Sequence, residues 1–356
     1  MTEEPAFPLP PRELASRVFA VEGWSDADQA YLTLGAQTKE QIVRMLPDDW
    51  SFEGKRVLDF GCGAGRTLRH FAPEAGVAEF WGADIDGPSI EWMRESMSPP
   101  IHAWQSAQLP PMGLEHGSFD LIYAISVFTH LTEGSAPWLL ELHRLLRPGG
   151  LLIVTYMGRW NSAWFAHEPW DENRVGMNVL HHNRAWEDGG PAVLISDWWL
   201  REHWGRAFEV VEIVPEFHSF SWALLRRRDV ELTSEELMAP SDDPREFAAM
   251  RHNVVQLQRE LVNELDYQEQ CHQILMQGQG YPMVATHDRR ILEAALRSAR
   301  ENGRKSPEWE VQMLLGVRGG TARALAQDGV RVRVCVPYGP DWYSSFVSRI
   351  AERPTN

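Results

Sequence analysis

A glycine-rich segment between residues 56 and 71, RVLDFGCGAGRTLRHF, has the pattern of a ligand-binding loop. An apolar run ends in Asp59, and Gly61, Gly63 and Gly65 follow at alternate positions. Glycine lets the backbone bend sharply and approach a ligand closely, and a helix start after the loop offers unpaired N–H groups. We therefore predict a strand, a tight turn and a helix start that together form a nucleotide-type binding site.

A second acidic position lies at the end of the next predicted strand. Residues 79–83 run into Asp84, about twenty residues after the glycines. A carboxylate at that place can accept hydrogen bonds from both hydroxyls of a ribose. NAD-dependent dehydrogenases share this feature, so a dehydrogenase stays open at this point. Asp86, in contrast, has the position of a cap for the helix predicted from Pro88 to Met97.

Two histidines are the candidates for proton transfer. His130 follows the apolar run 119–125, at the sheet edge where ligands bind, and His203 lies in SDWWLREHWGR (196–206). Histidine titrates close to neutral pH, so either ring suits the general base that an oxygen or nitrogen nucleophile needs. For His130, a structural role beside the site is an equally good interpretation. Neither the histidines nor the three cysteines show zinc-site spacing, so we predict no metal.

Strand and helix patterns alternate from residue 56 to about residue 156. The predicted strands cover residues 56–60, 79–83, 119–125 and 151–156, and the predicted helices cover residues 88–97 and 136–146. Such alternation predicts an α/β fold, a Rossmann-like doubly wound sheet that is mostly parallel and has helices on both faces. Residues 208–214 and 220–226 are expected to add an antiparallel pair. Between them and the sheet, residues 157–206 are expected to form loops and short helices over the ligand edge.

Four motifs in order make residues 50–230 resemble the class I S-adenosylmethionine-dependent methyltransferases. They are VLDFGCGAGR (57–66), GADID (82–86), GSFDLIYAISVFTHL (117–131) and LHRLLRPGGLLIVT (142–155). The resemblance implies a methyltransferase sheet that binds S-adenosyl-L-methionine. It also implies that Tyr31 and Gly35, ahead of the first strand, close over the cofactor.

The same resemblance assigns roles to individual residues. The residues that it places at the cofactor are Asp59, Gly61, Cys62, Gly63, Gly65, Asp84, Ile85, Gln105, Ser106 and Ser126. Asp84 matches the ribose-binding acid, and Ile85 matches the residue stacked on adenine. Gln105 or Ser106 would meet the adenine amino group, in a segment where the family often has Asp. Residues 126–130 would border the methyl group and the substrate.

Nine tryptophans between residues 138 and 222 bear on the methyl acceptor. Aromatic faces suit apolar or sugar-ring substrates, although core packing is the better interpretation for any single tryptophan. The whole pattern of residues 56–206, including GGPAVLISDWWLREHWGR (189–206), resembles bacterial methyltransferases found near polysaccharide and glycosyltransferase functions. We predict methyl transfer to an O or N nucleophile of a small molecule or glycan. The alternative is a catalytically lapsed protein that binds S-adenosylmethionine and mediates assembly.

The composition of the 356-residue chain argues against several classes of partner. The formal charge is −16, whereas broad nucleic-acid binding needs an excess of Lys and Arg, so we expect no nucleic acid. No apolar run is long enough to span a bilayer. Three cysteines suggest a reducing compartment, and the acidic, proline-rich start is not that of a signal peptide, so we expect a cytoplasmic protein.

A helix with one apolar stripe is predicted after the methyltransferase region. Its apolar residues are Phe247, Met250, Val254, Leu257, Leu261 and Leu265. This spacing suits packing or a coiled coil. We favour a linker helix packed on its own domain, and a homodimer through residues 244–265 is the alternative.

The last part of the chain resembles the end of proline dehydrogenase, a flavin-dependent βα barrel. The matching segments are GYPMVATHDRRIL (280–292), WEVQMLLGVR (309–318), VRVRVCVPYGPDWYSSF (330–346) and SRIAERPTN (348–356). Only the last few βα units have counterparts, and eight strands close such a barrel. Cys335 stands where the family usually has Tyr, and Ser348-Arg349 where it usually has an Arg pair. We therefore predict no proline oxidation by this chain alone, with a flavin-dependent oxidoreductase as the alternative.

Four parts are expected along the chain. They are an N-terminal helical arm (1–55), a methyltransferase domain (56–230), a linker helix (231–266) and a truncated proline-dehydrogenase-like segment (267–356).

Overall fold

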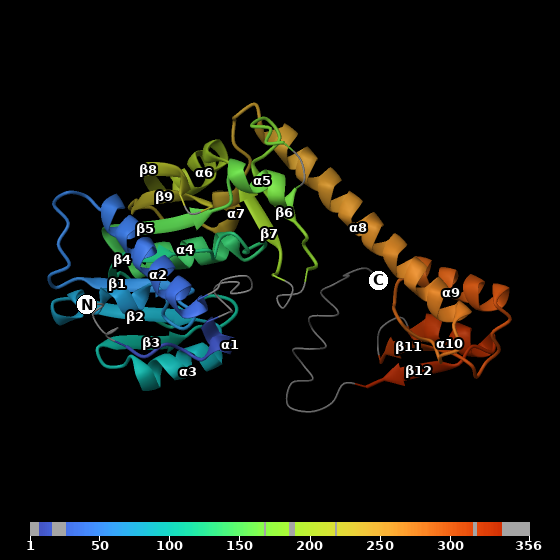
Figure 1. Ribbon diagram of the computed structural model, residues 1–356. Helices are drawn as coiled ribbons and strands as arrows, with labels where there is room; N and C mark the ends of the chain where they lie inside the picture. The colour runs from blue at the N-terminus through green and yellow to red at the C-terminus, as the bar shows by residue number, and fades with distance from the viewer. Residues whose placement is uncertain are drawn as a thin grey trace. The chain divides into compact units, whose positions relative to one another are not determined.

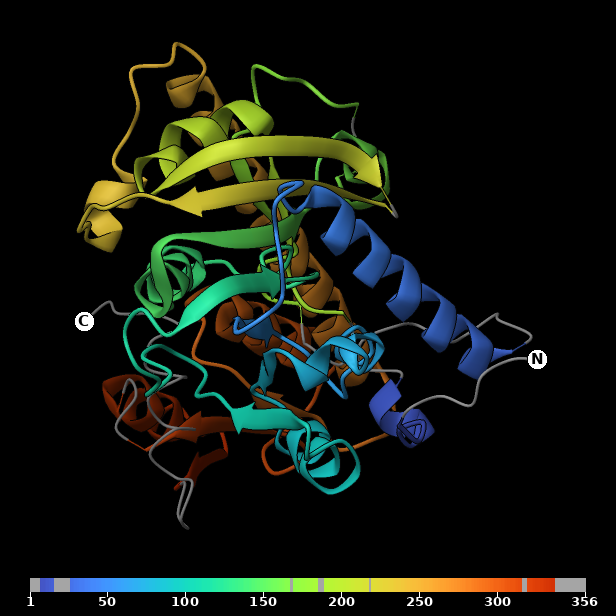
Figure 2. The ribbon, with the colours of Figure 1, turned by 90° about the vertical axis from the view of Figure 1, so that its left-hand side faces the viewer.

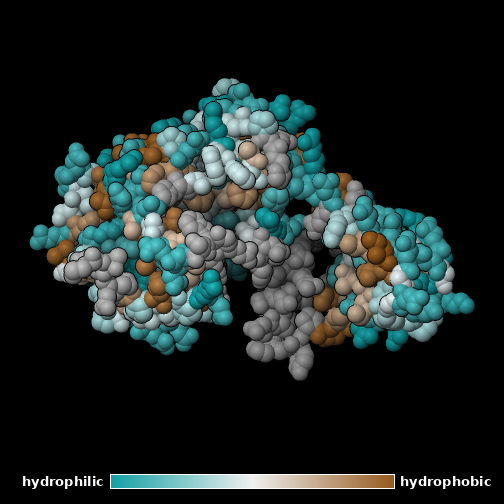
Figure 3. Space-filling model, in the orientation of Figure 1, coloured by the Kyte–Doolittle hydropathy of each residue, from teal (hydrophilic) through white to brown (hydrophobic). Residues whose placement is uncertain are grey.

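The computed structural model describes residues 7–15, 26–166, 169–184, 189–217, 219–315 and 319–336. The chain divides into two compact units, Met1–Leu257 and Gln258–Asn356, and each is described by itself (Figure 1). No helix within the described ranges is both long enough and apolar enough to cross a bilayer. On the face shown in Figure 3, hydrophilic side chains predominate and hydrophobic ones form scattered patches.

A seven-stranded sheet organises the first unit. Its strands are β1 (Arg56–Phe60), β2 (Glu79–Asp84), β3 (Ile101–Gln105), β4 (Phe119–Ala124), β5 (Leu146–Tyr156), β8 (Phe208–Phe217) and β9 (Phe220–Arg227). They lie in the order β3-β2-β1-β4-β5-β9-β8, side by side in the view of Figure 2. The first five strands are parallel, and β9 is antiparallel to both of its neighbours. The predicted doubly wound, mostly parallel sheet with an antiparallel final pair is confirmed.

Helices cover both faces of this sheet because alternate strand residues point to opposite sides. The helices are α1 (Arg12–Ala15), α2 (Ala27–Met45), α3 (Gly87–Ser96), α4 (Ser135–Leu145), α5 (Arg159–Phe165), α6 (Asp197–His203) and α7 (Ser234–Met238). On one face, Val57 of β1 packs in a cluster with residues of α2 and α3. On the other face, Leu58 packs in a cluster with residues of α4 and α6. All six residues of β4 are buried, as its apolar sequence predicts.

The local structure differs from the sequence prediction at two places. The glycine loop leads into a 3₁₀ turn, Leu68–Phe71, and not into an α-helix. Pro73 has no N–H to continue the helical hydrogen bonds, which accounts for the short element. Residues 157–206 contain, besides short helices, an antiparallel strand pair formed by β6 (Met177–Leu180) and β7 (Ala192–Ile195) that the prediction missed. Two short 3₁₀ turns, Glu74–Gly76 and Trp204–Arg206, complete the unit.

The predicted linker helix is α8 (Glu246–Gln277), which is longer than expected. It packs on the first unit as predicted, through Leu257 of the predicted stripe and through residues outside the stripe. Ala249 is buried in the core cluster, and Asn253 Oδ1 accepts a hydrogen bond of 2.9 Å from the Val179 N–H. Phe247 and Val254, in contrast, are 76% and 52% exposed. The stripe is therefore only partly used for this packing.

Three parallel strands form the core of the second unit. They are β10 (Met283–Ala285), β11 (Glu310–Leu314) and β12 (Val332–Cys335), with α9 (Arg289–Glu301) and α10 (Gly319–Gln327) between them. Glu310 is fully buried, and Arg333 on the next strand donates a hydrogen bond of 2.7 Å to its carboxylate. This hydrogen bond holds the pKa of Glu310 at about 2. Ser348 and Arg349 lie outside the described residues.

Candidate active site

The loops that carry the predicted site residues meet at one edge of the sheet. Parallel pairing places Phe60 beside Ala83, and Asp84 beside Gln105, so the carboxyl ends of β1, β2 and β3 are level. In a parallel sheet ligands bind at this edge. The sheet therefore brings the glycine loop and the residues that follow β2, β3 and β4 together.

The glycine loop needs its first glycine for two reasons. Gly61 has φ +80°, in the left-handed region that residues with a Cβ avoid. A Cβ at Gly61 would also overlap the side chain of Val127, which follows β4. The Gly61 N–H donates a hydrogen bond of 2.8 Å to Ala83 O. The loop is thus held between the end of β2 and the loop after β4.

Asp84 ties this loop to the end of β2. Its Oδ2 accepts a hydrogen bond of 2.7 Å from the Gly63 N–H, and its Oδ1 accepts one of 2.8 Å from the Asp86 N–H. Each carboxylate oxygen retains a second lone pair that can accept a hydrogen bond from a ligand hydroxyl. Burial raises the pKa of Asp84, while these backbone hydrogen bonds lower it. Asp86 caps α3 by accepting from the Ser89 N–H at 3.1 Å, as predicted.

Asp59 lies at the end of β1 and is only 4% exposed. Burial and, to a smaller extent, the charge of Asp84 together raise the pKa of Asp59 to about 8, although Tyr123 and the Arg66 guanidinium oppose the rise. At neutral pH the carboxyl group therefore holds its proton unless a cation approaches. A cationic ligand at the loop would favour the ionised form, because opposite charge stabilises a carboxylate.

Helix α2 lies against the glycine loop from outside the sheet. The buried Tyr31 hydroxyl donates a hydrogen bond of 3.1 Å to Ala64 O. Gly35 permits close approach, because a Cβ there would overlap the Arg66 carbonyl. These contacts place the two α2 residues that the sequence singled out directly on the loop.

The residues after β2 and β3 form a more open surface. Ile85 is 57% exposed, which is unusual for a large aliphatic side chain and suits a platform for a flat ring. Gln105 is exposed and lies against Gly87. Ser106 is buried, and its hydroxyl has no hydrogen-bond partner among the described residues. The Ser106 N–H donates to Asp84 O at 2.9 Å, so this hydroxyl lies beside the loop residues.

The Cys62 side chain does not share this surface. Its thiol is buried in the core cluster of the sheet face covered by α2 and α3, and Sγ lies 3.7 Å from Met93 Sδ. Burial raises the pKa of Cys62 well above its ordinary value, so the thiol is inert. Cys62 could therefore contact a ligand at the glycine loop through its backbone and not through its buried side chain.

The loop after β4 begins with a strained residue. Ser126 has φ +59°, a conformation that is uncommon for residues with a side chain and clusters at functional sites. The Ser126 N–H donates a hydrogen bond of 2.7 Å to Thr155 Oγ1 at the end of β5. Its Oγ lies 3.3 Å from Thr129 Oγ1. Sequence reasoning did not single out Thr155, although it ends the LHRLLRPGGLLIVT motif.

His130, in the same loop, is held in one tautomer. Its Nδ1 donates a hydrogen bond of 2.7 Å to Pro191 O, because a carbonyl oxygen can only accept. The lone pair of the neutral ring then resides on Nε2. Burial lowers the pKa of His130, although the Pro191 carbonyl partly opposes this. The ring is therefore neutral at pH 7, which is the state that a general base requires.

His203 lies in the core and not at this edge. It is 1% exposed and stacks on Trp199 with ring centroids 4.3 Å apart. Its Nε2 is 3.0 Å from Glu246 Oε2, and its Nδ1 is 3.3 Å from Leu237 O. Both nitrogens thus join α6 to α7 and α8. This position contradicts the prediction of a base and indicates a structural role.

Comparison with known proteins finds two families in the chain. Residues 57–150 match the methyltransferase domain family, and residues 254–342 match the proline dehydrogenase family. The tRNA U34 carboxymethyltransferase of Idiomarina loihiensis is 34% identical over 158 residues, which are 36% of this chain and 48% of that protein. Proline dehydrogenase 2 of Bacillus subtilis (strain 168) is 42% identical over 76 residues, which are 21% of this chain and 25% of that protein.

Among solved structures, an S-adenosylmethionine dependent methyltransferase from Mesorhizobium loti aligns with 53% of this chain and 96% of its own. The TM-score is 0.42 and the sequence identity is 19%. The chain spans about half and about a quarter of the two curated relatives named above. It therefore carries a methyltransferase domain over residues 57–150 and a proline dehydrogenase family segment over residues 254–342.

Proposed function

We propose that the first unit is an S-adenosylmethionine-dependent methyltransferase that acts on an oxygen or nitrogen nucleophile of a small molecule or glycan. The observation that carries this proposal is the glycine loop. Its Gly63 N–H is hydrogen-bonded to Asp84, and the loop lies beside the exposed Ile85. The match of residues 57–150 to the methyltransferase domain family supports it.

The residues at the sheet edge fit the proposed cofactor. The buried hydroxyl of Ser106, which has no hydrogen-bond partner in the part of the chain that the structure describes, is a group that a ligand could satisfy. Backbone groups of the glycine loop and Asp59 would hold the methionine part, Asp84 the ribose, and Ile85 the adenine. When bound, S-adenosylmethionine supplies an activated methyl group on a sulfonium.

His130 is the proposed base. The hydrogen bond to Pro191 orients the ring, and burial keeps it neutral, so Nε2 can take the proton of an acceptor hydroxyl or amine. Ser126 and Thr129 border the same loop and would position the acceptor. Much of the rate would come from holding the nucleophile in line with the methyl group.

Replacement of His130 tests this role. We expect His130→Ala to lower kcat about 10²- to 10⁴-fold while S-adenosylmethionine binds as before. The wild-type rate should fall on the acid side as the ring gains its proton, and this limb should lie below pH 6.5 because the pKa of His130 is lowered. The test is an acceptor screen, beginning with sugars, followed by pH–rate profiles. An unchanged profile in the variant would remove His130 from the chemistry.

The alternative of a catalytically lapsed binding protein makes a distinct prediction. Such a protein would bind S-adenosylmethionine but would methylate no acceptor, with or without His130.

The charge of −16 supports a small-molecule or glycan acceptor over nucleic acid.

We propose that the second unit does not oxidise proline by itself, although its 42% identity to a proline dehydrogenase favours the opposite view. Its described part has three parallel strands, whereas the barrel needs eight. Cys335 stands on β12, where the family usually has Tyr. We expect purified full-length protein to show no flavin absorbance and no proline-dependent dye reduction. Flavin that copurifies with such activity would overturn this proposal.

We also propose that α8 supports a homodimer through residues 244–265. Phe247, Met250, Val254 and Leu261 are exposed at spacings of three, four and seven residues. This is the a/d pattern through which identical helices pair. The pattern is self-complementary, so a second copy of the chain is the proposed partner.

A further inference from the structure

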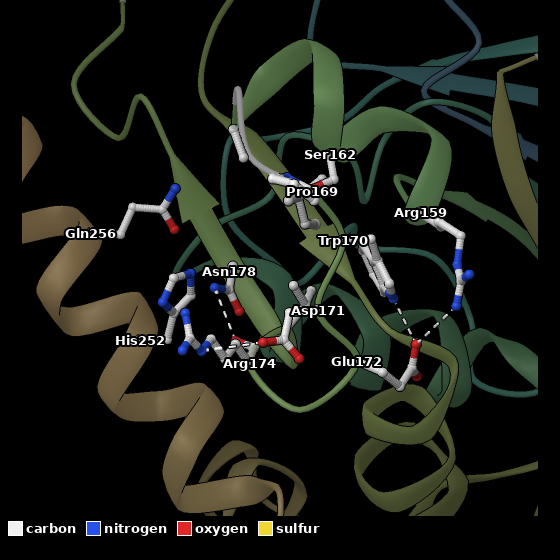
Figure 4. Close-up of a pocket in the computed structure, with 13 residues that line it drawn as sticks. Arg159, Ser162, Pro169, Trp170, Asp171, Glu172, Arg174, Asn178, His252 and Gln256 are labelled. Carbon is white, nitrogen blue, oxygen red and sulfur yellow. Dashed lines mark hydrogen bonds and ion pairs between the residues drawn. The ribbon is translucent and has the colours of Figure 1, made fainter.

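A cavity of about 610 Å³ lies in the first unit, away from the glycine loop (Figure 4). Its walls come from α5, from residues 169–178, from β7 and from the first half of α8. The volume is within the range of small-molecule sites. None of the residues predicted from the sequence as cofactor ligands or as the base lines this cavity.

The walls of the cavity are fixed by contacts of their own. Trp198 Nε1 donates to Glu172 O at 3.1 Å and to Val175 O at 3.0 Å, which anchors the 169–178 segment. Gly176 lets this segment lie close to α8, because a Cβ there would be 3.2 Å from Ala249 Cβ. The cavity is therefore formed before any ligand enters, as most ligand sites are.

The charged residues of the cavity already neutralise one another. Glu172 Oε2 accepts a hydrogen bond of 2.6 Å from Trp170 Nε1 and lies 3.8 Å from the Arg159 guanidinium. Asp171 Oδ2 lies 3.2 Å from Arg174 Nε. Two carboxylates thus balance two guanidinium groups. These four groups therefore give the cavity no net positive charge that would favour a phosphate or carboxylate ligand.

The other polar groups offer neutral donors and acceptors around an aromatic wall. Figure 4 shows Asn178 and Gln256 on one side of the cavity and Trp170 on another. Asn178 is 1% exposed; its Oδ1 accepts a hydrogen bond of 3.1 Å from the Gly176 N–H, and its Nδ2 donates a long one of 3.5 Å to Arg174 O. The amide groups can donate as well as accept. The indole ring offers a flat apolar surface.

We infer that this cavity binds a neutral sugar ring. A sugar has hydroxyls that both donate and accept, and a face of C–H groups that packs on an aromatic ring. A purely apolar ligand would leave the second Nδ2 hydrogen of Asn178 and the Gln256 amide facing apolar groups, at a cost in free energy. The paired charges and the amides around Trp170 therefore select a polyhydroxylated, uncharged ligand.

Strand β7 connects this cavity with the loop of His130. Leu194 lines the cavity, while its neighbour Val193 donates an N–H bond of 2.8 Å to Thr129 O. Pro191, just before β7, accepts the hydrogen bond from His130. Strand β7 therefore contributes one residue to the cavity and a backbone contact to the loop that follows β4. The inference itself concerns binding and does not require methyl transfer.

Binding of defined sugars to the full-length protein tests the inference. The probes are methyl glycosides of common hexoses, deoxyhexoses and pentoses, neutral disaccharides, and hexose phosphates as charged counterparts, followed by saturation-transfer NMR and fluorescence titration. We expect saturable binding of at least one neutral glycoside, and binding about tenfold weaker in Trp170→Ala. Gln256→Ala, on α8, should also weaken it.

Trp164→Ala is the matched control, because Trp164 lies on α5, is 66% exposed and does not line the cavity. It should bind the glycoside as the wild type does, and all variants should keep the wild-type affinity for S-adenosylmethionine. Failure of every neutral sugar to bind would overturn the inference. So would binding that survives both cavity substitutions, or tighter binding of hexose phosphates that is lost in Arg159→Gln.

Discussion

Two carboxyl groups meet at the glycine loop, and burial acts on both. The pKa of Asp59 is raised to about 8 from its ordinary value of 3.8, first by burial and then by the charge of Asp84. A group whose pKa is higher in the folded state contributes stability that is fully present below its unfolded pKa. That contribution is lost as pH rises towards the folded pKa. The contribution of Asp59 to the free energy of unfolding should therefore decrease as pH rises from about 4 to about 8.

Asp59→Asn should remove this dependence, because the amide does not titrate. We expect the free energy of unfolding of the wild type, relative to the variant, to fall by a few kcal/mol as pH rises through this window. Denaturant titrations of both proteins at several pH values give the difference, in which the titration of all other groups cancels. Parallel curves for the two proteins would show that Asp59 ionises normally.

Acidic residues and glycines at the predicted strand ends located the candidate site better than single histidines did. Asp59, Asp84 and the glycines were predictable because strand and helix periodicity placed them at one sheet edge. His203 misled because its sequence neighbours gave no sign that α7 and α8 would bury it, with Leu237 and Glu246 as hydrogen-bond partners. Long-range contacts of this kind are not encoded in local spacing.

At the scale of elements, the parallel strands were predictable, whereas the strand pair within residues 157–206 was not. β1 matches its predicted bounds because an apolar run, a glycine turn and burial agree. β6 and β7 were missed because each has only four residues and because the connection between them, residues 181–191, is much longer than a usual hairpin loop. Short strands depend on their partner for stability, so sequence pattern alone identifies them poorly. The cavity beside Trp170 depends on these strands and could not be predicted either.

The apolar spacing in helix α8 is compatible both with packing on its own domain and with a coiled coil. Its apolar stripe was expected to pack on its own domain; Leu257 does so together with Ala249 and Asn253, whereas Phe247 and Val254 are exposed. The exposed part of the stripe is thereby left for another partner.

Substitutions on this stripe test the proposed homodimer. We expect light scattering to give the mass of a dimer for the wild type and of a monomer for Phe247→Ser combined with Val254→Ser, because two apolar contact positions are lost. Arg251→Ser, an exposed polar position on the same helix, is the control and should leave the mass unchanged. A wild-type monomer, or a double variant that remains dimeric, would exclude this stripe as the interface.

At the scale of the whole chain, two families follow one another along the sequence. The candidate cofactor site uses only residues of the first unit, from α2 to β5. The proposed cofactor site therefore depends on the glycine loop more than on any other feature. Two glycines with positive φ offer a controlled comparison: Gly61 (φ +80°) in the loop, and Gly54 (φ +67°) outside it, where a Cβ would meet nothing.

Calorimetric titration of the full-length protein with S-adenosylmethionine is the most direct test. We predict micromolar binding by the wild type and by Gly54→Ala, and binding at least about tenfold weaker by Gly61→Ala, because only Gly61→Ala adds an overlap with Val127 to the shared backbone strain of about 1 kcal/mol. Absence of binding by the wild type, or equal affinity of Gly61→Ala and Gly54→Ala, would contradict the proposed cofactor site.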